Sequence, residues 1–194
     1  MQKLRYKKSF ENFLNNSNIT KKNKEIVTEF LKFKESQNLS TNRLLRILAS
    51  LKLFCYLTPR NFNELTQKDL QTIILKIIDR NCNDWTKVTD LKILKMFVKW
   101  INKKYGLDLN VNIINTKKPK NSLLPEYLIT EEEFNKLMNA TDDLQTKVLI
   151  GLLYESGARV GEILSLKIQN VSFNRYGAKI IVKGKTGQRV IPII

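Results

Sequence analysis

The most informative segment of this sequence is YESGARVGEILSL, residues 154–166. Its second half predicts a short helix from Ala158 to Leu166. Arg159 and Glu162 are three residues apart on that helix, so their side chains share one helix face. The segment therefore sets a permanent cation beside a carboxylate that can orient it.

Helices are expected before this segment and strands after it. Thr130, followed by three glutamates, forms a capping box that predicts a helix start, and a second helix runs from Asp142 or Asp143 to about Ser156. Beyond Leu166 the apolar period changes to two, which predicts short strands joined by glycine-containing turns. The strands are Val171 to Phe173, Ala178 to Val182 and Arg189 to Ile193, joined at Gly177 and at Gly184 to Gly187. This part predicts an α+β unit with a small antiparallel three-stranded sheet.

The first hundred residues show a helical period throughout. Apolar residues recur three and four positions apart in four stretches, and Pro59 ends the second of them. The stripes include Ile26, Val27, Phe30, Leu31 and Phe33; Leu44, Leu45, Ile47, Leu48, Leu51 and Phe54; Leu70, Ile73, Ile74, Ile77 and Ile78; Val88, Leu91, Leu94, Phe97, Val98 and Trp100. The expected N-caps are Ser40 or Thr41, then Thr66, then Thr86 or Asp84. Four amphipathic helices with short connections predict a helical bundle.

The chain is therefore expected to be mainly α and to have two parts. Residues 1–104 form the helical part and residues 128–194 the α+β part. Between them, residues 105–127 are dominated by Asn, Lys and Pro, which predicts a basic linker.

The charge is strongly positive and unevenly distributed. Lys and Arg number 34 against 18 Asp and Glu, a net charge of +16. Up to Leu124 there are 25 basic and 10 acidic residues, against 9 and 8 after it. Basic side chains bind polyanions by neutralising phosphates and releasing counterions, so the asymmetry predicts nucleic-acid binding by the N-terminal region. The alternative is a Lys-rich surface that serves solubility alone.

Several classes of protein are excluded or disfavoured by what the sequence lacks. It has no histidine, which excludes Ser-His-Asp and Cys-His triads, imidazole zinc sites and histidine general bases. We expect no metal and no cofactor. No run of about 18 apolar residues is present, and no apolar signal stretch follows Met1 to Lys8, so we expect a cytoplasmic protein without a membrane span. Cys55 and Cys82 lack metal-site spacing and are interpreted as buried small hydrophobes.

Residues 154–166 strongly resemble the first catalytic box of the tyrosine recombinases, the phage integrase and Xer family. The family pattern is a small residue and Gly, one residue, Arg, two residues, Glu or Asp, then Leu-x-x-Leu. GKTGQRVIP, residues 184–192, is similar to the family's hairpin with its mobile lysine. Upstream, LSTN at 39–42, Leu65-Thr66 and FVKWI at 97–101 look like its SAM-like core-binding domain. The resemblance implies a core-binding domain at residues 1–104 and the N-terminal half of a catalytic domain at 128–194.

The resemblance implies site-specific recombination, in which DNA strands are cut and rejoined through a phosphotyrosine intermediate. Arg159 would bind the non-bridging oxygens where charge develops, and Glu162 would orient it. Lys185, on a glycine-flanked turn, would protonate the leaving 5′-oxygen. Taken singly, the pair could be an ordinary surface ion pair and the lysine a solvated turn residue.

The sequence departs from the family in its last part. The family also needs an H-x-x-R box, a further His or Trp, and a C-terminal tyrosine nucleophile. This chain has no His, and it ends nine residues after Lys185 with its six tyrosines all upstream of that lysine. We therefore expect it to bind DNA without turnover on its own. It would be a truncated chain, a natural fragment of a split integrase gene, or half of a two-chain enzyme.

The expected partner is double-stranded DNA. Helix starts with polar caps and nearby cations suit phosphate contacts. The expected contact residues are Thr41, Asn42, Arg43, Arg46, Lys87, Lys92 and Lys95, with Lys117, Lys118 and Lys120 of the linker. We expect either a homo-oligomer on paired sites or a second chain that supplies the C-terminal catalytic half.

Two other function classes are compatible with the sequence. One is a non-catalytic DNA-binding protein that regulates recombination or transcription, and the other is a helical interaction protein whose charge is incidental. A steep salt dependence of binding separates the last class from the other two.

Overall fold

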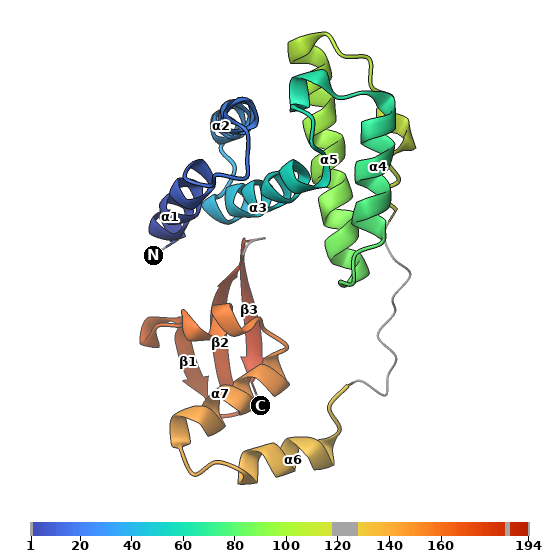
Figure 1. Ribbon diagram of the computed structural model, residues 1–194. Coiled ribbons are helices and arrows are strands. Elements are labelled where there is room, and N and C mark those ends of the chain that lie inside the picture. The colour runs from blue at the N-terminus through green and yellow to red at the C-terminus, as the bar shows by residue number, and fades with distance from the viewer. Residues whose placement is uncertain (1, 118–127, 185–186, 194) are drawn as a thin grey trace. The chain divides into compact units, whose positions relative to one another are not determined.

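The fold is seen in a computed structural model that describes residues 2–117, 128–184 and 187–193 (Figure 1). The chain divides into two compact units, which we call unit 1 (Met1–Asn121) and unit 2 (Ser122–Ile194). Each unit has its own buried core. The described residues are mainly helical with one small antiparallel sheet, which confirms the predicted fold class. Among them, no helix is long and apolar enough to cross a membrane.

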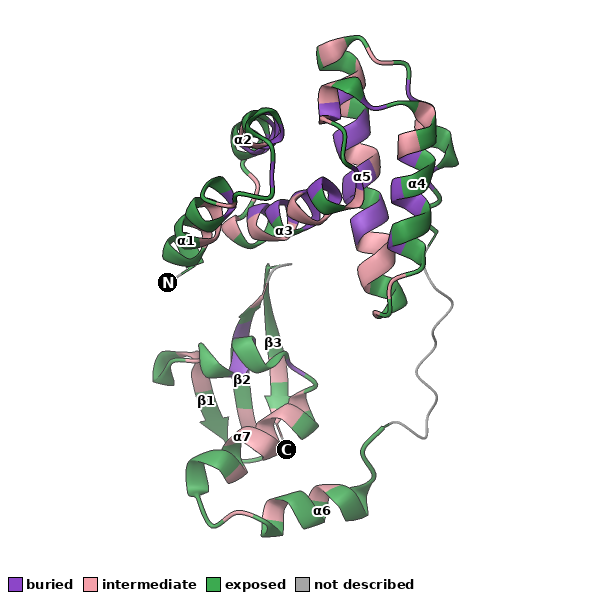
Figure 2. Cartoon of the chain, viewed as in Figure 1, coloured by how far each residue is buried: buried purple, intermediate pink, exposed green. Residues whose placement is uncertain are grey.

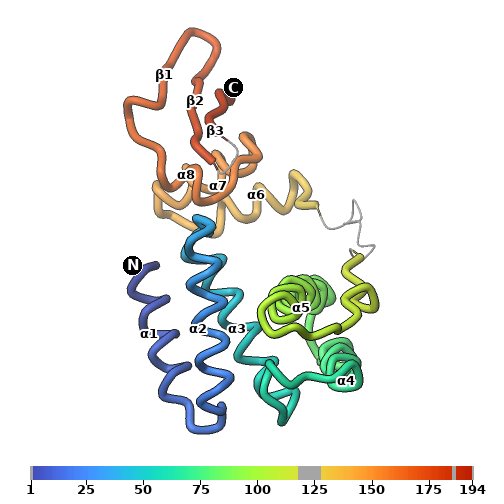
Figure 3. Tube along the Cα trace, turned by 90° about the horizontal axis from the view of Figure 1, so that it is seen from above, coloured from blue at the N-terminus to red at the C-terminus, as the bar shows by residue number. Residues whose placement is uncertain are grey.

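The described part of unit 1 is built from five α-helices. They are α1 (Gln2–Leu14), α2 (Lys21–Glu35), α3 (Thr41–Leu57), α4 (Gln67–Ile78) and α5 (Asp84–Tyr105), with 3₁₀ turns at Phe62–Glu64 and Val111–Ile113. Helix α3 contacts the other four helices. Helices α1, α2 and α3 lie side by side in Figure 3, where the adjacent α4 and α5 are seen nearly end-on. The long third helix therefore organises the unit.

The helix starts follow the expected capping chemistry with one difference. Ser40 caps α3 by accepting from the backbone N–H of Arg43, and Thr66 forms a capping box with Asp69 at α4. Helix α5 is capped by Asn83, not by Thr86 or Asp84, because the Asn83 side chain accepts from the backbone of Trp85. The predicted start was therefore one to three residues late.

Helix α1 is an addition to the four helices predicted from the sequence. Its three aromatic side chains recur at four and three residues, and the rings of Tyr6 and Phe10 and those of Phe10 and Phe13 are stacked neighbours, 6.2 and 6.4 Å apart. Phe13 is fully buried in the core of unit 1. The spacing of these aromatics was the signal for this helix, which the dense Lys and Arg around them obscured.

The core of unit 1 is rich in aromatic side chains. The rings of Phe30 and Phe62 both meet Phe97 edge-on, with centroids 5.1 and 4.9 Å away. Two residues expected in the core, Phe33 and Ile78, are exposed instead. Phe33 lies at the edge of a pocket, with its ring centroid 6.4 Å from that of Trp100, and Ile78 is the last residue of α4. Figure 2 shows buried, intermediate and exposed residues interspersed along the helices of unit 1.

The described beginning of the segment 105–127 packs on unit 1. Leu109 and Ile114 are buried in the core. The Asn102 side chain donates to the carbonyl of Leu109 at 2.8 Å and accepts from its N–H at 3.4 Å, which ties this segment to α5. Residues 118–127 lie outside the described residues.

Unit 2 places helices against one face of a three-stranded sheet. Its elements are α6 (Glu131–Asn139), α7 (Leu144–Ser156), α8 (Val160–Leu164), β1 (Val171–Asn174), β2 (Gly177–Gly184) and β3 (Gly187–Ile193), with a 3₁₀ turn at Ile168–Asn170. The strands are antiparallel in the order β1-β2-β3, and α7 contacts β3 while α8 contacts β2. Ile180 and Val182 are buried, whereas Lys179 and Lys183 are exposed, as period-two alternation requires.

The register of β2 and β3 decides which side chains face the helices. Val182 pairs with Arg189, and Gly184 pairs with Gly187. Residues directly opposite in an antiparallel pair lie on the same face, so Arg189 shares the buried face of Val182. This places a cation on the side of the sheet that α8 covers.

Candidate functional site

The site begins at the sharp junction between α7 and α8. Gly157 adopts a left-handed conformation, with φ of 56°, and ends α7. The backbone N–H of Ala158 then donates to the Ser156 hydroxyl at 3.1 Å. Two residues after the glycine, Arg159 is the N-cap of α8. This tight turn positions the arginine at the start of a helix whose next turn carries Glu162.

Glu162 is a buried carboxylate, only 4% exposed, surrounded by N–H donors. Its Oε1 accepts from Nη1 of Arg159 at 2.9 Å and from Nη1 of Arg189 at 3.1 Å. Its Oε2 accepts from Nη2 of Arg189 at 2.8 Å and from the backbone N–H of Arg159 at 3.0 Å. Arg189 is therefore bidentate, the strongest geometry for such a pair.

These donors stabilise the ionised carboxylate. The hydrogen bonds from Arg189, followed by that from the backbone of Arg159, lower the pKa of Glu162 from its ordinary value to about 2. The group is a permanent anion at neutral pH. Two arginines facing one carboxylate leave the cluster with a surplus positive charge.

Gly184 allows the sheet to approach this carboxylate. A Cβ at position 184 would overlap Oε1 of Glu162 and lie 3.1 Å from its Cδ. The glycine is needed here for space, because any side chain would displace the carboxylate from the two arginines.

Arg159 is the exposed member of the cluster. Its side chain is 67% accessible, compared with 40% for Arg189 and 4% for Glu162. It can therefore meet an anionic ligand while Nη1 stays on Glu162. Lys167 and Lys183 line a cavity of about 370 Å³ beside Glu162 and add further positive charge.

Unit 1 has two basic clefts among its described residues. The first, which we call the α1–α3 cleft, has a volume of about 620 Å³. It is lined by Arg5, Ser9, Asn12, Asn42, Leu45, Arg46, Leu48, Ala49 and Lys52. None of these residues is acidic, so the cleft is suited to an anion.

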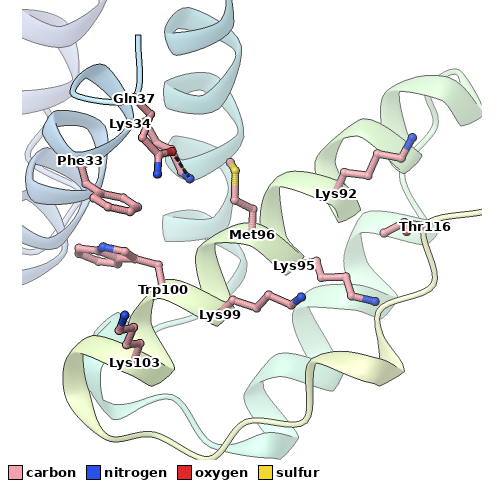
Figure 4. A pocket seen from close by; sticks show the side chains of 10 residues that line it. All are labelled: Phe33, Lys34, Gln37, Lys92, Lys95, Met96, Lys99, Trp100, Lys103 and Thr116. Carbon is pink, nitrogen blue, oxygen red and sulfur yellow. Dashed lines mark hydrogen bonds between the residues drawn. The ribbon is translucent and has the colours of Figure 1, made fainter. Parts of the chain in front are cut away.

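The second, which we call the α2–α5 cleft, has a volume of about 450 Å³ (Figure 4). It is lined by Phe33, Lys34, Gln37, Lys92, Lys95, Met96, Lys99, Trp100, Lys103 and Thr116. Lys34 is buried there without a carboxylate partner in the described chain, and its Nζ donates to Gln37 at 2.9 Å. Desolvation lowers its pKa.

Comparison with known proteins identifies the family. Residues 128–194 match the phage integrase family. The tyrosine recombinase XerA of Pyrococcus horikoshii is 31% identical over 177 residues, covering 88% of this chain and 56% of that protein. XerD of Haemophilus ducreyi is 31% identical over 165 residues, covering 81% and 54%. The chain belongs to the tyrosine recombinase family.

Solved structures of tyrosine recombinases share the fold. A lambda integrase tetramer bound to a Holliday junction matches with a TM-score of 0.70 at 18% identity, covering 87% of this chain and 49% of that one. XerH bound to its difH substrate matches with a TM-score of 0.56 at 19% identity, covering 82% and 50%. This chain spans about half the length of the curated tyrosine recombinases that it matches.

The residues that the tyrosine recombinase pattern singled out are partly brought together. Arg159 and Glu162 are in direct contact, whereas Lys185 lies outside the described residues. Its flanking glycines, Gly184 and Gly187, are paired at the ends of β2 and β3. The hairpin therefore ends next to the Glu162 cluster.

The expected DNA contacts fall in several places. Asn42 and Arg46 line the α1–α3 cleft, and Lys92 and Lys95 line the α2–α5 cleft, where Nζ of Lys95 also donates to the carbonyl of Ile114 at 3.4 Å. The remaining described ones, Thr41, Arg43, Lys87 and Lys117, line neither cleft. Lys118 and Lys120 lie outside the described residues.

Arg46 has a structural partner that the sequence did not reveal. Its Nη2 donates to Oδ1 of the buried Asp90 at 2.7 Å, and Ser50 donates to the same oxygen at 2.7 Å. Nη1 of Arg80 donates to Oδ2 at 2.8 Å. This network joins α3, the C-terminal side of α4 and α5 around one carboxylate, so Arg46 also contributes to the core of unit 1.

Four residues were not predicted from the sequence as part of a site: Arg189 and Gly184 at the Glu162 cluster, and Arg5 and Lys52 in the α1–α3 cleft. Arg189 could have been found from the strand period of two, because it shares one face of β3 with the apolar Ile191 and Ile193. Its partner could not, since Glu162 is 27 residues away on a helix. In the described part of the chain, no group of three or more Cys, Asp or Glu side chains could hold a metal ion.

Proposed function

We propose that this chain binds duplex DNA and supplies part of the active site of a tyrosine recombinase, which cuts and rejoins DNA strands through a phosphotyrosine intermediate. The observation that carries the proposal is the Arg159–Glu162–Arg189 cluster. An exposed guanidinium is held on a buried carboxylate, at the box that defines the family resemblance. XerA and XerD, its relatives, are tyrosine recombinases by name.

The chemistry proposed for Arg159 follows from its charge and exposure. Cleavage of a phosphodiester places negative charge on the non-bridging oxygens in the transition state. A guanidinium presents several N–H donors in one plane and keeps its charge at any physiological pH. Because Nη1 is anchored on Glu162, the remaining donors meet the phosphate without first having to be oriented.

Lys185 is proposed as the general acid for the leaving 5′-oxygen. The proposal rests on its place between Gly184 and Gly187, at the end of the hairpin that adjoins Glu162. A lysine can deliver a proton to an alkoxide as the P–O bond breaks, which lowers the barrier to cleavage.

DNA affinity is proposed to come mainly from unit 1. We assign the core-binding domain to residues 1–104, a share of the catalytic domain to 128–194 and the connection between them to 105–127, of which Leu109 and Ile114 pack in the core of unit 1. The region up to Leu124 holds nearly all of the surplus positive charge. The proposed contacts are Thr41, Asn42, Arg43, Arg46, Lys87, Lys92 and Lys95, with Lys117, Lys118 and Lys120. Four of them, Asn42, Arg46, Lys92 and Lys95, line the two basic clefts.

Assembly on DNA is part of the proposal. Lambda integrase is a tetramer on a Holliday junction in its solved structure, and XerH is bound to difH. We propose that this chain likewise acts on paired DNA sites, either with further copies of itself or with a second chain.

A salt titration tests the proposed function. Binding of the 194-residue chain to a labelled duplex is measured over a series of salt concentrations. The logarithm of the binding constant should fall linearly with the logarithm of salt concentration, by about 0.9 for each phosphate neutralised. Affinity that does not change with salt would refute DNA binding through this basic surface.

A further inference from the structure

We infer that Arg189 is a positioning residue, which holds Glu162 in the one orientation that presents the Arg159 guanidinium to a DNA phosphate. The inference rests on the proposed function, because it takes Arg159 as the phosphate ligand. It adds a residue of β3 to a site for which the sequence indicated only α8 and the hairpin turn.

The geometry of the carboxylate is the first argument. Both terminal nitrogens of Arg189 donate to Glu162, one to each oxygen, at 3.1 and 2.8 Å. A two-point contact fixes the plane of the carboxylate, which a single bond would leave free to rotate. The same Oε1 accepts from Nη1 of Arg159, so the plane set by Arg189 determines where that nitrogen lies.

The division of exposure is the second argument. Arg189 is 40% exposed, and both of its terminal nitrogens already donate to a buried anion. Arg159 is 67% exposed and gives Glu162 only Nη1 of its side chain among the described contacts. A phosphate would have to compete with a carboxylate for Arg189 but finds unused donors on Arg159. The structure therefore separates a holding arginine from a ligand-binding one.

The position of Arg189 in the hairpin is the third argument. It lies two residues after Gly187, which pairs with Gly184 at the end of β2. Gly184 in turn borders Glu162 so closely that a side chain has no room. The ion pair thus ties the end of the hairpin to the start of α8. Through Glu162, Arg159 is fixed relative to Gly184 and Gly187, the two glycines on either side of Lys185 and Thr186.

A double-mutant cycle between Arg159 and Arg189 tests the inference at constant charge. Arg189→Lys keeps the positive charge but removes the two-point contact. In the wild-type chain, Arg159→Gln should weaken duplex binding by about tenfold, the size typical of a coupled charged contact. In the Arg189→Lys background the same change should cost less than about twofold, because Arg159 is no longer oriented.

Lys179→Gln is the matched control for this cycle. It removes a cation from the same sheet, but from the exposed face of β2, away from Glu162. The cost of Arg159→Gln should remain about tenfold in that background. If the cost also stays near tenfold in Arg189→Lys, the inference is refuted. An equal cost in both backgrounds means that the two changes are additive, so that any loss caused by Arg189→Lys does not act through Arg159.

A second measurement needs no DNA. The Glu162 carboxyl carbon is followed by NMR while the pH is lowered, in the wild-type chain, in Arg189→Lys and in Arg189→Gln. It should titrate near pH 2 in the wild type and shift toward its ordinary value of about 4.3 in Arg189→Gln. The Arg159 guanidinium should rotate slowly in the wild type and faster in both variants, because Glu162 no longer holds it in one orientation. Unchanged Ile180 and Val182 methyl signals verify that unit 2 remains folded.

The two arms separate the inference from the proposed function. A chain whose Glu162 and Arg159 signals respond to the Arg189 variants, but which does not bind duplex DNA, refutes the proposed function and leaves the positioning role of Arg189 intact. A chain that binds DNA with the expected salt dependence, but whose Arg159 signals do not respond to Arg189→Lys or Arg189→Gln, refutes the inference alone.

Discussion

Gly184 and Glu162 are in such close contact that the glycine backbone forms one wall of the carboxylate's site. Gly184→Ala should push the carboxylate away from Arg159 and Arg189 and destabilise unit 2 by about 1–3 kcal/mol, the range for overpacking. Unfolding in urea, followed by the methyl signals of Ile180 and Val182, measures the loss.

Gly151→Ala is the control for that change. Gly151 lies within α7, and a Cβ added at this position would have nothing within 4 Å beyond its own helix backbone and chain neighbours. Alanine favours helices over glycine by up to about 1 kcal/mol, so this variant should be neutral or stabilised. Equal destabilisation of both variants would contradict the assigned role of Gly184.

The low pKa of Glu162 predicts an acid-sensitive unit 2. Its folded pKa of about 2 lies below an unfolded value of about 4.3, so the carboxylate stabilises the fold fully above pH 4.3. That contribution is lost as the pH falls from about 4.3 to 2. The urea midpoint of unit 2 should fall over this window in the wild type. Glu162→Gln should show a smaller fall, and identical pH profiles would disprove the linkage.

Asp90 holds the α3–α5 side of unit 1 together. Asp90→Asn leaves Arg46 and Arg80 facing a neutral side chain, so it should cost about 3 kcal/mol of the free energy of unfolding. Fluorescence of Trp85 and Trp100, which both lie in unit 1, reports the urea transition. The exposed Asp84, 3.6 Å from Lys87, gives the control Asp84→Asn, which should change stability by less than about 1 kcal/mol.

Arg43 and Arg46 should separate affinity from stability. Arg43 is exposed at the start of α3, so Arg43→Ala should reduce the salt slope of DNA binding by about 0.9 and leave unfolding unchanged. Arg46→Ala should also lower stability, because Asp90 loses a partner. If the combined Arg43→Ala, Arg46→Ala variant bound DNA like the wild type at low salt, the start of α3 would not be part of the DNA-binding surface.

Residues 1–124, which retain the buried core of unit 1, should keep most of the DNA affinity.

Strand cleavage should need a tyrosine nucleophile in addition to the Arg159–Glu162–Arg189 cluster. With a nicked suicide duplex we expect no covalent adduct from this chain alone, because in the described part of the chain no hydrogen bond joins a tyrosine to Arg159, Glu162 or Arg189. Supplying a segment that carries a tyrosine nucleophile should produce the adduct, and Arg159→Ala should abolish it.

A 5′-thiol leaving group tests Lys185 in the same assay. Because a thiol leaves without a proton, it should rescue Lys185→Ala but not Arg159→Ala. Rescue of both variants, or of neither, would contradict this division of roles. An adduct formed by the 194-residue chain alone would contradict the need for an added tyrosine nucleophile.

The sequence predicted correctly those features that depend on interactions between residues close together in the chain. The N-cap at Thr66, the capping box at Thr130, the three strands and the contact of Arg159 with Glu162 all depend on residues within a few positions of one another. Period and capping chemistry were sufficient for them.

Contacts between distant elements could not be predicted in this way. Strand parity places Arg189 on the inner face, but its pairing with Glu162 depends on how α8 packs on β2 and on the absence of a side chain at Gly184. Arg46 was predicted only as a DNA contact because Asp90, its buried partner, is 44 residues away. Phe33 was predicted in the core but lines the α2–α5 cleft beside Trp100, because periodicity does not show which positions of a helix face border an open cleft.

The two units differ greatly in how much apolar surface they bury. Among the described residues, 25 buried side chains form the core of unit 1, whereas four, Ala158, Ile163, Ile180 and Val182, form that of unit 2. Amide protons of α3 and α5 should therefore exchange slowly with solvent, and those of the small sheet quickly. Any ligand that binds only the folded form of unit 2 adds RT ln(1 + [L]/Kd) to its stability. Occupancy of the Arg159 site should thus be readable as slowed hydrogen exchange in β2 and β3.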